Sequence, residues 1–231
     1  MKPTRDNYET LQRAYDFFNT ELFGGALPQC LITLQRKNKA MGYYSAARFR
    51  SMVDQETTTD EIALNPMHFV TAKGDMEIMQ TLVHEMCHLW QHHFGKPSRN
   101  GYHNREWANK MESVGLVPSS TGRPGGKKTG QRMGDYAQEG GRFEQAFTLW
   151  AKDNHIEWAD ASSFAQLAAM MGGSGQATAV ATPAAAAGTR GRNKQKYTCP
   201  KCGQNAWAKP SAKLVCGECI EEGVVMMEPQ N

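Results

Sequence analysis

Residues 81–95 read TLVHEMCHLWQHHFG, and this stretch decides how the rest of the chain is interpreted. It holds four of the seven histidines of the chain, and two of them, His84 and His88, flank a Glu-Met-Cys triplet. In an α-helix these two residues lie one turn apart on one face, so their imidazoles can converge on one metal ion with Glu85 beside them. Zinc suits this arrangement because it binds neutral imidazole nitrogens and, in catalytic sites, keeps one position open for water. The stretch therefore predicts a helix that carries a catalytic Zn²⁺ site.

The apolar residues of this predicted helix cover most of its circumference. The remaining residues form a polar stripe, which consists of Thr81, His84, Glu85, His88 and His92. A mostly buried helix with one polar stripe is suited to the wall of a cleft. The alternative is a surface helix with chance histidines, because short H-E-x-x-H matches also arise by accident. The apolar surroundings favour the cleft.

A catalytic zinc site has three protein ligands, so a third ligand must come from another part of the chain. We choose His103, which begins the next helical stretch, HNREWANKMES, after a turn-rich loop. Glu106 is the chemical alternative, because a glutamate completes some other H-E-x-x-H sites. His92 and His93 follow the first pair too closely on the same helix. We expect His92 to be a cleft residue and His93 to be a partly buried helix residue.

A second metal site is predicted near the C-terminus, where four of the six cysteines form two Cys-x-x-Cys pairs. Thirteen residues separate the pairs, which leaves room for a β-hairpin between two knuckles that present four thiolates to one ion. Metal is favoured over disulfides because no secretion signal accompanies the pairs. A closed site of four thiolates has no place for water, so this second Zn²⁺ is expected to be structural. Its predicted ligands are Cys199, Cys202, Cys216 and Cys219.

The rest of the chain predicts an α+β domain followed by a tether. Apolar residues at helical spacing predict a helix over residues 8–22, and three short runs rich in β-branched and aromatic residues predict a small sheet. For the third run, EIALN at 61–65, we weigh an edge strand that pairs with an extended substrate against an ordinary core strand. Residues 115–141 break any period and predict a long ordered loop or a substrate-facing lid. The expected division is a domain over 1–171, a flexible linker over 172–196 and a zinc ribbon over 197–231.

The distribution of charge says more about partners than the net charge of +3 does. Residues 161–217 contain no acidic residue and seven lysines and arginines. Tyr197 and Trp207 in this segment can stack on unpaired bases while the lysines contact phosphates. In the alternative, Trp207 fills the small core of the ribbon. No apolar run resembles a signal peptide or reaches the length of a membrane span, so we expect a cytoplasmic protein without membrane contact.

Five separated motifs occur in order along the chain: LFGGALP, GYYSAARFR, EIALNP, TLVHEMCHLWQ and GKPSRNGYHNREWANKM. Together they resemble the SprT-like zinc metalloproteases, the group related to Spartan, over residues 8–149, and the C-terminal zinc ribbon adds to the resemblance. The resemblance implies a zincin-like α+β fold, with a small sheet against the helix that carries H-E-x-x-H. It also implies zinc ligands at His84, His88 and His103, with Glu85 as the catalytic base. Relatives of Spartan cleave proteins that are bound or crosslinked to DNA.

We therefore expect a zinc-dependent endopeptidase that acts on protein substrates and is recruited to single-stranded or partly unpaired DNA. The expected cofactors are one catalytic and one structural Zn²⁺, and the expected state is a monomer. The alternative class is a non-proteolytic nucleic-acid-binding or transcription-associated zinc protein, whose former active site only stabilises the fold. The intact Glu85 argues against it, because a purely structural site needs no base beside its ligands. The group that stabilises the oxyanion stays open among Tyr102, Arg105 and the basic loop.

Overall fold

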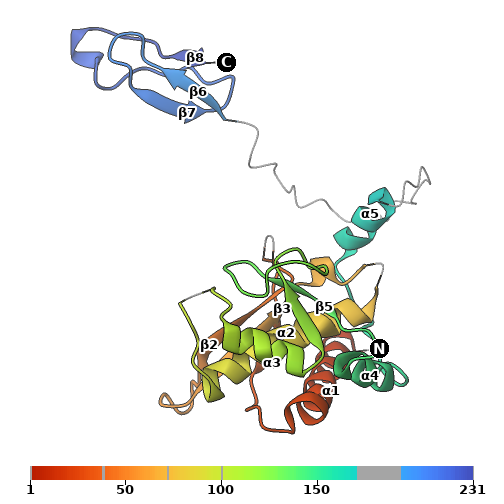
Figure 1. Ribbon diagram of the computed structural model, residues 1–231. Helices are drawn as coiled ribbons and strands as arrows, with labels where there is room; N and C mark the ends of the chain where they lie inside the picture. The colour runs from red at the N-terminus through yellow and green to blue at the C-terminus, as the bar shows by residue number, and fades with distance from the viewer. Residues whose placement is uncertain (1, 38–39, 72, 100, 171–193, 231) are drawn as a thin grey trace. The chain divides into compact units, whose positions relative to one another are not determined.

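The chain divides into two units in the computed structural model, residues 1–174 and residues 175–231, and each is described by itself (Figure 1). The described residues are 2–230 without 38–39, 72, 100 and 171–193. Most of the linker that we expect over 172–196 lies outside the described residues. The expected domain boundaries therefore stay predictions.

The first unit mixes helices and strands, as the α+β prediction requires. In chain order its elements are α1 (Pro3–Phe23), β1 (Leu31–Leu34), β2 (Gly42–Arg50), β3 (Thr58–Leu64), the 3-10 helix η1 (Pro66–His68), α2 (Asp75–Phe94), α3 (Arg105–Ser113), β4 (Leu116–Ser119), β5 (Gly134–Ala137), α4 (Arg142–Trp150) and α5 (Ala161–Met170). None of the helices in the described part of the chain is both long and apolar enough to cross a membrane.

The two long helices both end at glycines. Helix α1 stops at Gly24, whose φ of 67° lies in the left-handed region that glycine adopts without strain. Helix α2 spans the H-E-x-x-H motif and stops at Gly95, whose backbone N–H donates to the carbonyl of Gln91. The whole H-E-x-x-H motif therefore lies on one uninterrupted helix.

The sheet of the first unit has the strand order β1-β3-β2. Strand β1 pairs with β3 in parallel, and β2 pairs with β3 antiparallel. The edge-strand prediction for residues 61–65 is wrong, because β3 is the central strand and has partners on both sides. Its residues from Asp60 to Leu64 are all buried, and such a continuous buried run is typical of a central strand rather than an edge. Strand β2 lies on an edge instead.

A second, smaller sheet forms within residues 115–141, where the sequence predicts only a loop or lid. Strands β4 and β5 pair antiparallel from Leu116 opposite Ala137 to Ser119 opposite Gly134. Each strand has only four residues, so the glycines, prolines and lysines around them conceal any alternation of polar and apolar residues. The hairpin also reaches helix α2, where the Gln80 side chain donates to the Oδ1 atom of Asp135 on β5 at 2.6 Å.

The hydrophobic core packs one face of the three-stranded sheet against helices α1 to α4. Its largest buried members include Leu11, Tyr15, Phe18, Ile62, Leu64, Met79, Leu82, Met86, Trp107, Phe143 and Trp150. Helix α3 lies beside α2, and α4 lies beside α1 (Figure 1). Because the apolar side of α2 is held in this core, its polar stripe faces the other way, toward a cavity.

The second unit is a small three-stranded antiparallel sheet with the strand order β7-β6-β8. Its elements are β6 (Gln195–Thr198), β7 (Asn205–Ala208), the 3-10 helix η2 (Ile220–Glu222) and β8 (Glu228–Gln230). Strand β6 begins at Gln195, inside the segment expected to be linker. The hydrophobic core of this unit is very small, because its five buried members are Tyr197, Cys199, Cys216, Cys219 and Met227.

Candidate metal centres

The polar stripe of α2 lines a cavity of about 1140 Å³. All five stripe residues that the sequence singles out, Thr81, His84, Glu85, His88 and His92, contribute to its wall. The other walls come from the first half of β2, from residues 97–99 and 101–103 before α3, and from residues 132–135 at the start of β5. The cleft prediction for this helix is confirmed.

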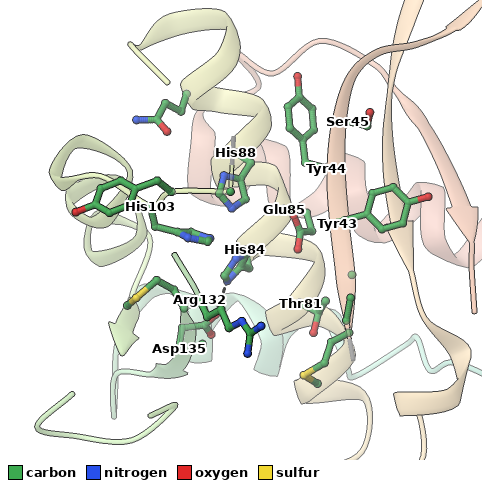
Figure 2. A pocket seen from close by; sticks show the side chains of 18 of the residues that line it. Tyr43, Tyr44, Ser45, Thr81, His84, Glu85, His88, His103, Arg132 and Asp135 are labelled. Carbon is green, nitrogen blue, oxygen red and sulfur yellow. Dashed lines mark hydrogen bonds and ion pairs between the residues drawn. The ribbon is translucent and has the colours of Figure 1, made fainter. Parts of the chain in front are cut away.

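Three imidazoles meet in this cavity. One nitrogen from each of His84, His88 and His103 lies within 4.8 Å of the others, so the three can hold one metal ion. The ring centroids are 5.3 Å apart for His84 and His88, and 4.8 Å apart for His88 and His103. Figure 2 shows the three rings converging, with Glu85 on the side of β2. The structure thus brings the predicted third histidine to the first two, and its role as a ligand stays a prediction.

Two of the three histidines are oriented by the β4–β5 hairpin. The Nδ1 atom of His84 lies 2.7 Å from the Oδ2 atom of Asp135, and the Nδ1 atom of His103 lies 3.2 Å from the carbonyl oxygen of Gly130. Asp135 is fixed in turn, because the Gln80 side chain donates to its Oδ1 atom at 2.6 Å. Acceptors on Nδ1 leave Nε2 of each ring free for a metal, which is the usual arrangement around histidine ligands.

Trp107 forms the apolar backing of the three imidazoles. It is fully buried on α3, and its ring centroid lies 4.4 Å from that of His103 and 4.9 Å from that of His84. The ring of His88 stacks against it at 5.0 Å. This packing restricts the rotation of all three side chains, so the three imidazoles are held in fixed positions relative to one another.

Burial and mutual repulsion keep two of the imidazoles neutral, the form that binds a metal. Burial first, and then the neighbouring histidines, lower the pKa of His88 well below its usual value. The same two causes lower the pKa of His103 to about 4. For His84, burial lowers the pKa, but the hydrogen bond to Asp135 and the charges of Glu85 and Asp135 outweigh it and raise the pKa overall. This imidazole therefore has the most basic nitrogen of the set.

Glu85 lies on the same helix and faces the cavity from a buried position, with 6% of its surface exposed. Burial raises the pKa of its carboxyl group, while His84 and the backbone N–H of Tyr44 act in the opposite direction. Strand β2 comes very close here, because a Cβ atom on Gly42 would lie 2.8 Å from Thr81 and 3.4 Å from the Glu85 side chain. Among the described residues Glu85 forms no ion pair with a lysine or arginine. Its carboxylate is therefore available to work as a base.

The alternative ligand, Glu106, faces away from the histidines. Its Oε2 atom accepts hydrogen bonds from the Gln91 side chain and the Lys96 backbone, both at 2.7 Å. His92 lines the cavity as expected, beside the ring of Tyr44. His93 is more exposed than expected, with its Nε2 atom 2.7 Å from Asp60. Glu106 and His93 thus have structural partners outside the cluster.

Asp135 and Gly130 are the site residues that the sequence does not reveal. Asp135 lies 51 positions after His84, and Gly130 lies 27 positions after His103. No spacing rule connects residues so far apart. Gly130 contributes its backbone carbonyl, which every residue type has, so its identity as a glycine does not indicate this role. The only available signal was a lone aspartate within a glycine-rich and basic stretch.

The hydrogen bond between His84 and Asp135 leads us to predict that Asp135 raises the zinc affinity of the histidine cluster. Asp135→Asn keeps the shape of the side chain but removes the charge that orients His84 and raises its basicity, so zinc affinity at this site should fall roughly 10- to 100-fold. Competition with a chromophoric chelator measures the change. Asp153→Asn, at an exposed position, is the matched control and should bind zinc like the wild type. Unchanged affinity in Asp135→Asn would show that the contact does not tune the site.

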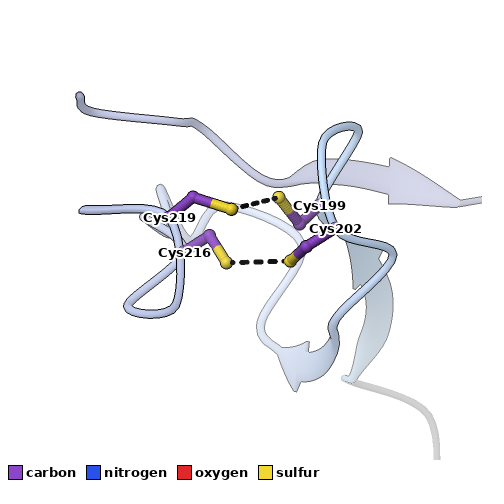
Figure 3. Close-up of side chains that lie close together, drawn as sticks. All are labelled: Cys199, Cys202, Cys216 and Cys219. Carbon is purple, nitrogen blue, oxygen red and sulfur yellow. Dashed lines mark hydrogen bonds between the residues drawn. The ribbon is translucent and has the colours of Figure 1, made fainter. Parts of the chain in front are cut away.

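The four predicted cysteine ligands also come together, in the second unit (Figure 3). The Sγ atoms of Cys199 and Cys219 lie 4.0 Å apart, and those of Cys202 and Cys216 lie 3.5 Å apart. Four sulfurs at about 2.3 Å around a tetrahedral zinc ion are roughly 3.8 Å from one another, whereas a disulfide needs about 2.05 Å. All four thiols are free of disulfides. The cluster therefore has the spacing of a four-thiolate zinc site.

The turn that carries the first pair of cysteines stabilises a thiolate. The backbone N–H of Cys202, followed by that of Lys201, lowers the pKa of Cys199 against the opposing effect of burial. Backbone N–H groups that point at sulfur are suited to a metal-bound thiolate, because they compensate its negative charge. The knuckle is therefore built to hold a charged sulfur.

Two aromatic residues of this unit lie differently from what the sequence suggests. Tyr197 is 3% exposed, and its hydroxyl group donates to the carbonyl oxygens of Lys209 and Pro210, so the prediction that it stacks on bases is wrong. Trp207 is 62% exposed and does not fill the core. It pairs directly opposite Lys196 across β6 and β7, so the two side chains share the solvent-facing side of the sheet.

Helix α2 presents two histidines and a glutamate, and with His103 beside them the three imidazoles could hold a metal ion. The model of the SprT-like family matches residues 11–124, which include His84, Glu85, His88 and His103. An uncharacterized protein in the mucB 3' region of Salmonella typhimurium is 55% identical over 62 residues, 26% of this chain and 80% of that protein. No solved structure matches the chain. The chain belongs to the SprT-like family, a metallopeptidase-like family.

Proposed function

We propose that this protein is a zinc-dependent endopeptidase. The observation that carries the proposal is the convergence of three imidazole nitrogens within 4.8 Å beside the buried Glu85, all on the wall of one large cavity. The donor set fits zinc, because His88 and His103 are held neutral and Asp135 orients His84. His84, His88 and His103 would hold the ion.

When bound, zinc supplies a Lewis acid that polarises a peptide carbonyl and makes a water molecule acidic near neutral pH. Glu85 accepts the proton of the attacking water and delivers it to the amine that leaves. Its raised pKa makes the carboxylate a stronger base than an exposed glutamate, and the protonated carboxyl group gives the proton to the leaving nitrogen as the C–N bond breaks. The close approach of Gly42 limits the space around Glu85, so its carboxylate is held beside the histidines.

The substrate is proposed to bind as an extended strand along β2. This strand lies on the edge of its sheet, and four consecutive residues at its start, Gly42 to Ser45, line the cavity. An edge strand has unpaired backbone groups that can pair with a peptide of almost any sequence. We therefore propose that β2, rather than residues 61–65, is the edge strand that pairs with an extended substrate. A peptide added to β2 would place its backbone beside Glu85.

We further propose that the ribbon recruits the enzyme to single-stranded or partly unpaired DNA, where it cleaves bound or crosslinked proteins. Trp207 offers an exposed ring on a sheet surface, and the exposed Lys196 lies opposite it. Exposed aromatic rings beside basic side chains are the features that stack bases and contact phosphates in proteins that bind single strands. Two further exposed lysines, Lys209 and Lys213, follow in the same unit.

The DNA-recruitment proposal is tested with the full-length protein, zinc and a DNA-binding protein as substrate. Single-stranded DNA should stimulate cleavage, and Trp207→Ala should weaken DNA affinity by roughly 5- to 150-fold, the range for one stacked base. Fluorescence anisotropy of a labelled oligonucleotide measures the affinity. Trp158→Ala, another exposed tryptophan but in the first unit, is the matched control. Cleavage that ignores DNA would remove the recruitment and leave the endopeptidase proposal intact.

A further inference from the structure

The rim of the histidine cavity is strongly basic. Its charged lining residues are five cations and three acids, namely Lys37, Arg48, Lys73, Arg99 and Arg132 against Glu77, Glu85 and Asp135. All five cations are exposed at the surface, and one of them, Arg48, is paired with the Glu61 carboxylate at 3.8 Å, which leaves four without an ion pair among the described residues. The acids are not equally available, because Asp135 is occupied by His84 and Gln80, and Glu85 is buried beside the histidines. An entering molecule therefore meets mainly positive charge.

Two of these cations are positioned by aromatic rings at separate parts of the rim. The Nζ atom of Lys37 lies 4.2 Å from the ring centroid of Tyr43, near the start of β2. The guanidinium carbon of Arg99 lies 5.2 Å from the ring centroid of Tyr102, next to His103. Such contacts restrict a long basic side chain without neutralising its charge. Both cations thus stay near the cavity and remain able to pair with an anion.

Arg132 is the cation closest in sequence to the orienting residue Asp135. Figure 2 shows its side chain on the hairpin side of the cavity, across from Tyr43 and Tyr44 on β2. It forms no ion pair with any residue that the structure describes. A guanidinium group presents donors in a planar fork that matches a carboxylate. This arginine is therefore poised to bind a carboxylate that enters with the substrate.

We propose that the cavity selects extended peptide segments with aspartate or glutamate on both sides of the bond that is cut. The inference rests on the proposed endopeptidase function and specifies its substrate class. A peptide that runs along β2 passes Lys37 beside Tyr43 and lies across the cavity from Arg132, while Arg99 stands beside Tyr102, next to His103. Acidic side chains near the cut bond meet these cations, whereas lysine or arginine side chains there are repelled.

The proposal is tested with three fluorogenic peptides that differ only in the residues that flank one central bond, which are glutamate, glutamine or lysine. The full-length protein with zinc should cleave them in the order glutamate, glutamine, lysine, with roughly a tenfold difference in kcat/KM between the first and the last. A single exposed ion pair contributes up to about fivefold, and more than one pair acts here. Arg132→Glu should abolish or reverse the order, and Lys37→Glu should reduce it. Lys152→Glu, exposed and outside the cavity, should leave it unchanged.

The outcomes separate the substrate class from the function itself. If the wild type cuts none of the peptides and no unfolded protein, the endopeptidase proposal fails. If it cuts all three equally, or prefers lysine, the function stands and the acidic preference is wrong. A third result also overturns the preference: equal cleavage of the peptides, combined with inhibition by a short oligonucleotide that Arg132→Glu relieves. That result would assign the basic rim to nucleic-acid phosphates.

Discussion

Glu85→Gln should reduce proteolysis by roughly 10²- to 10⁴-fold, the usual contribution of a general base, and should leave the zinc content unchanged. Glutamine has nearly the same shape as glutamate but cannot accept the proton of the attacking water. Glu85 is buried, and an unpaired charge at a buried position would destabilise the fold. The glutamine amide is neutral, so the substitution introduces no such charge. The helix and its three histidines should therefore keep their positions.

Initial rates on an unfolded protein substrate and zinc per chain, measured on the same preparation, check this prediction. Glu77→Gln is the matched control, since Glu77 lies on the same helix and on the same cavity but two turns before Glu85. Equal rates in Glu85→Gln and the wild type would remove Glu85 from the mechanism. A wild type that binds DNA and zinc but cleaves nothing would favour the non-proteolytic alternative.

Cys216→Ser should unfold the second unit and leave the first unit folded. Of the five buried residues that form the core of the second unit, three are cysteines of the cluster, so little apolar surface remains to hold it together. Zinc binding to such small modules contributes apparent free energies of about 10–16 kcal/mol, which makes folding depend on the ion. Loss of one thiolate should thus remove both the metal and the structure.

Hydrogen exchange resolved by peptide tests this second prediction. Peptides from residues 195–230 should lose their protection in Cys216→Ser, and zinc should fall from two ions per chain to one. Peptides that cover α2 should stay protected, because the core around them is large and independent of the cysteines. Cys30→Ala, outside the cluster, serves as the control for loss of a thiol. Retained protection in the second unit would contradict a metal-dependent fold.

The sequence was most informative where one element carries the signal. The i, i+4 spacing of His84 and His88 requires only a helix, and α2 is that helix. His103 is the predicted third ligand because zinc chemistry demands one and this residue begins the next helical stretch after a turn-rich loop. The two Cys-x-x-Cys pairs also predict a cluster of four cysteines, because each pair lies within one short turn of the chain. The candidate residues of both sites can therefore be recognised from short segments of the sequence.

The features that sequence reasoning missed depend on how distant segments pair. Strand order decides that β2 rather than β3 lies on the edge, and no local pattern encodes strand order. The face of the ribbon that Trp207 occupies follows from its register opposite Lys196. Asp135 becomes part of the site only because a hairpin folds back onto α2. Each of these facts is a property of tertiary structure.

The contribution of that hairpin has a consequence for the order in which the protein matures. A growing chain that has emerged only as far as residue 124 already carries all three imidazoles and Glu85. It still lacks Gly130 and Asp135, the acceptors that select the tautomers of His103 and His84. The ligands are thus synthesised before the groups that orient them. Under the proposed function, tight binding of the ion therefore needs a chain that extends through β5, because only then are both orienting acceptors present.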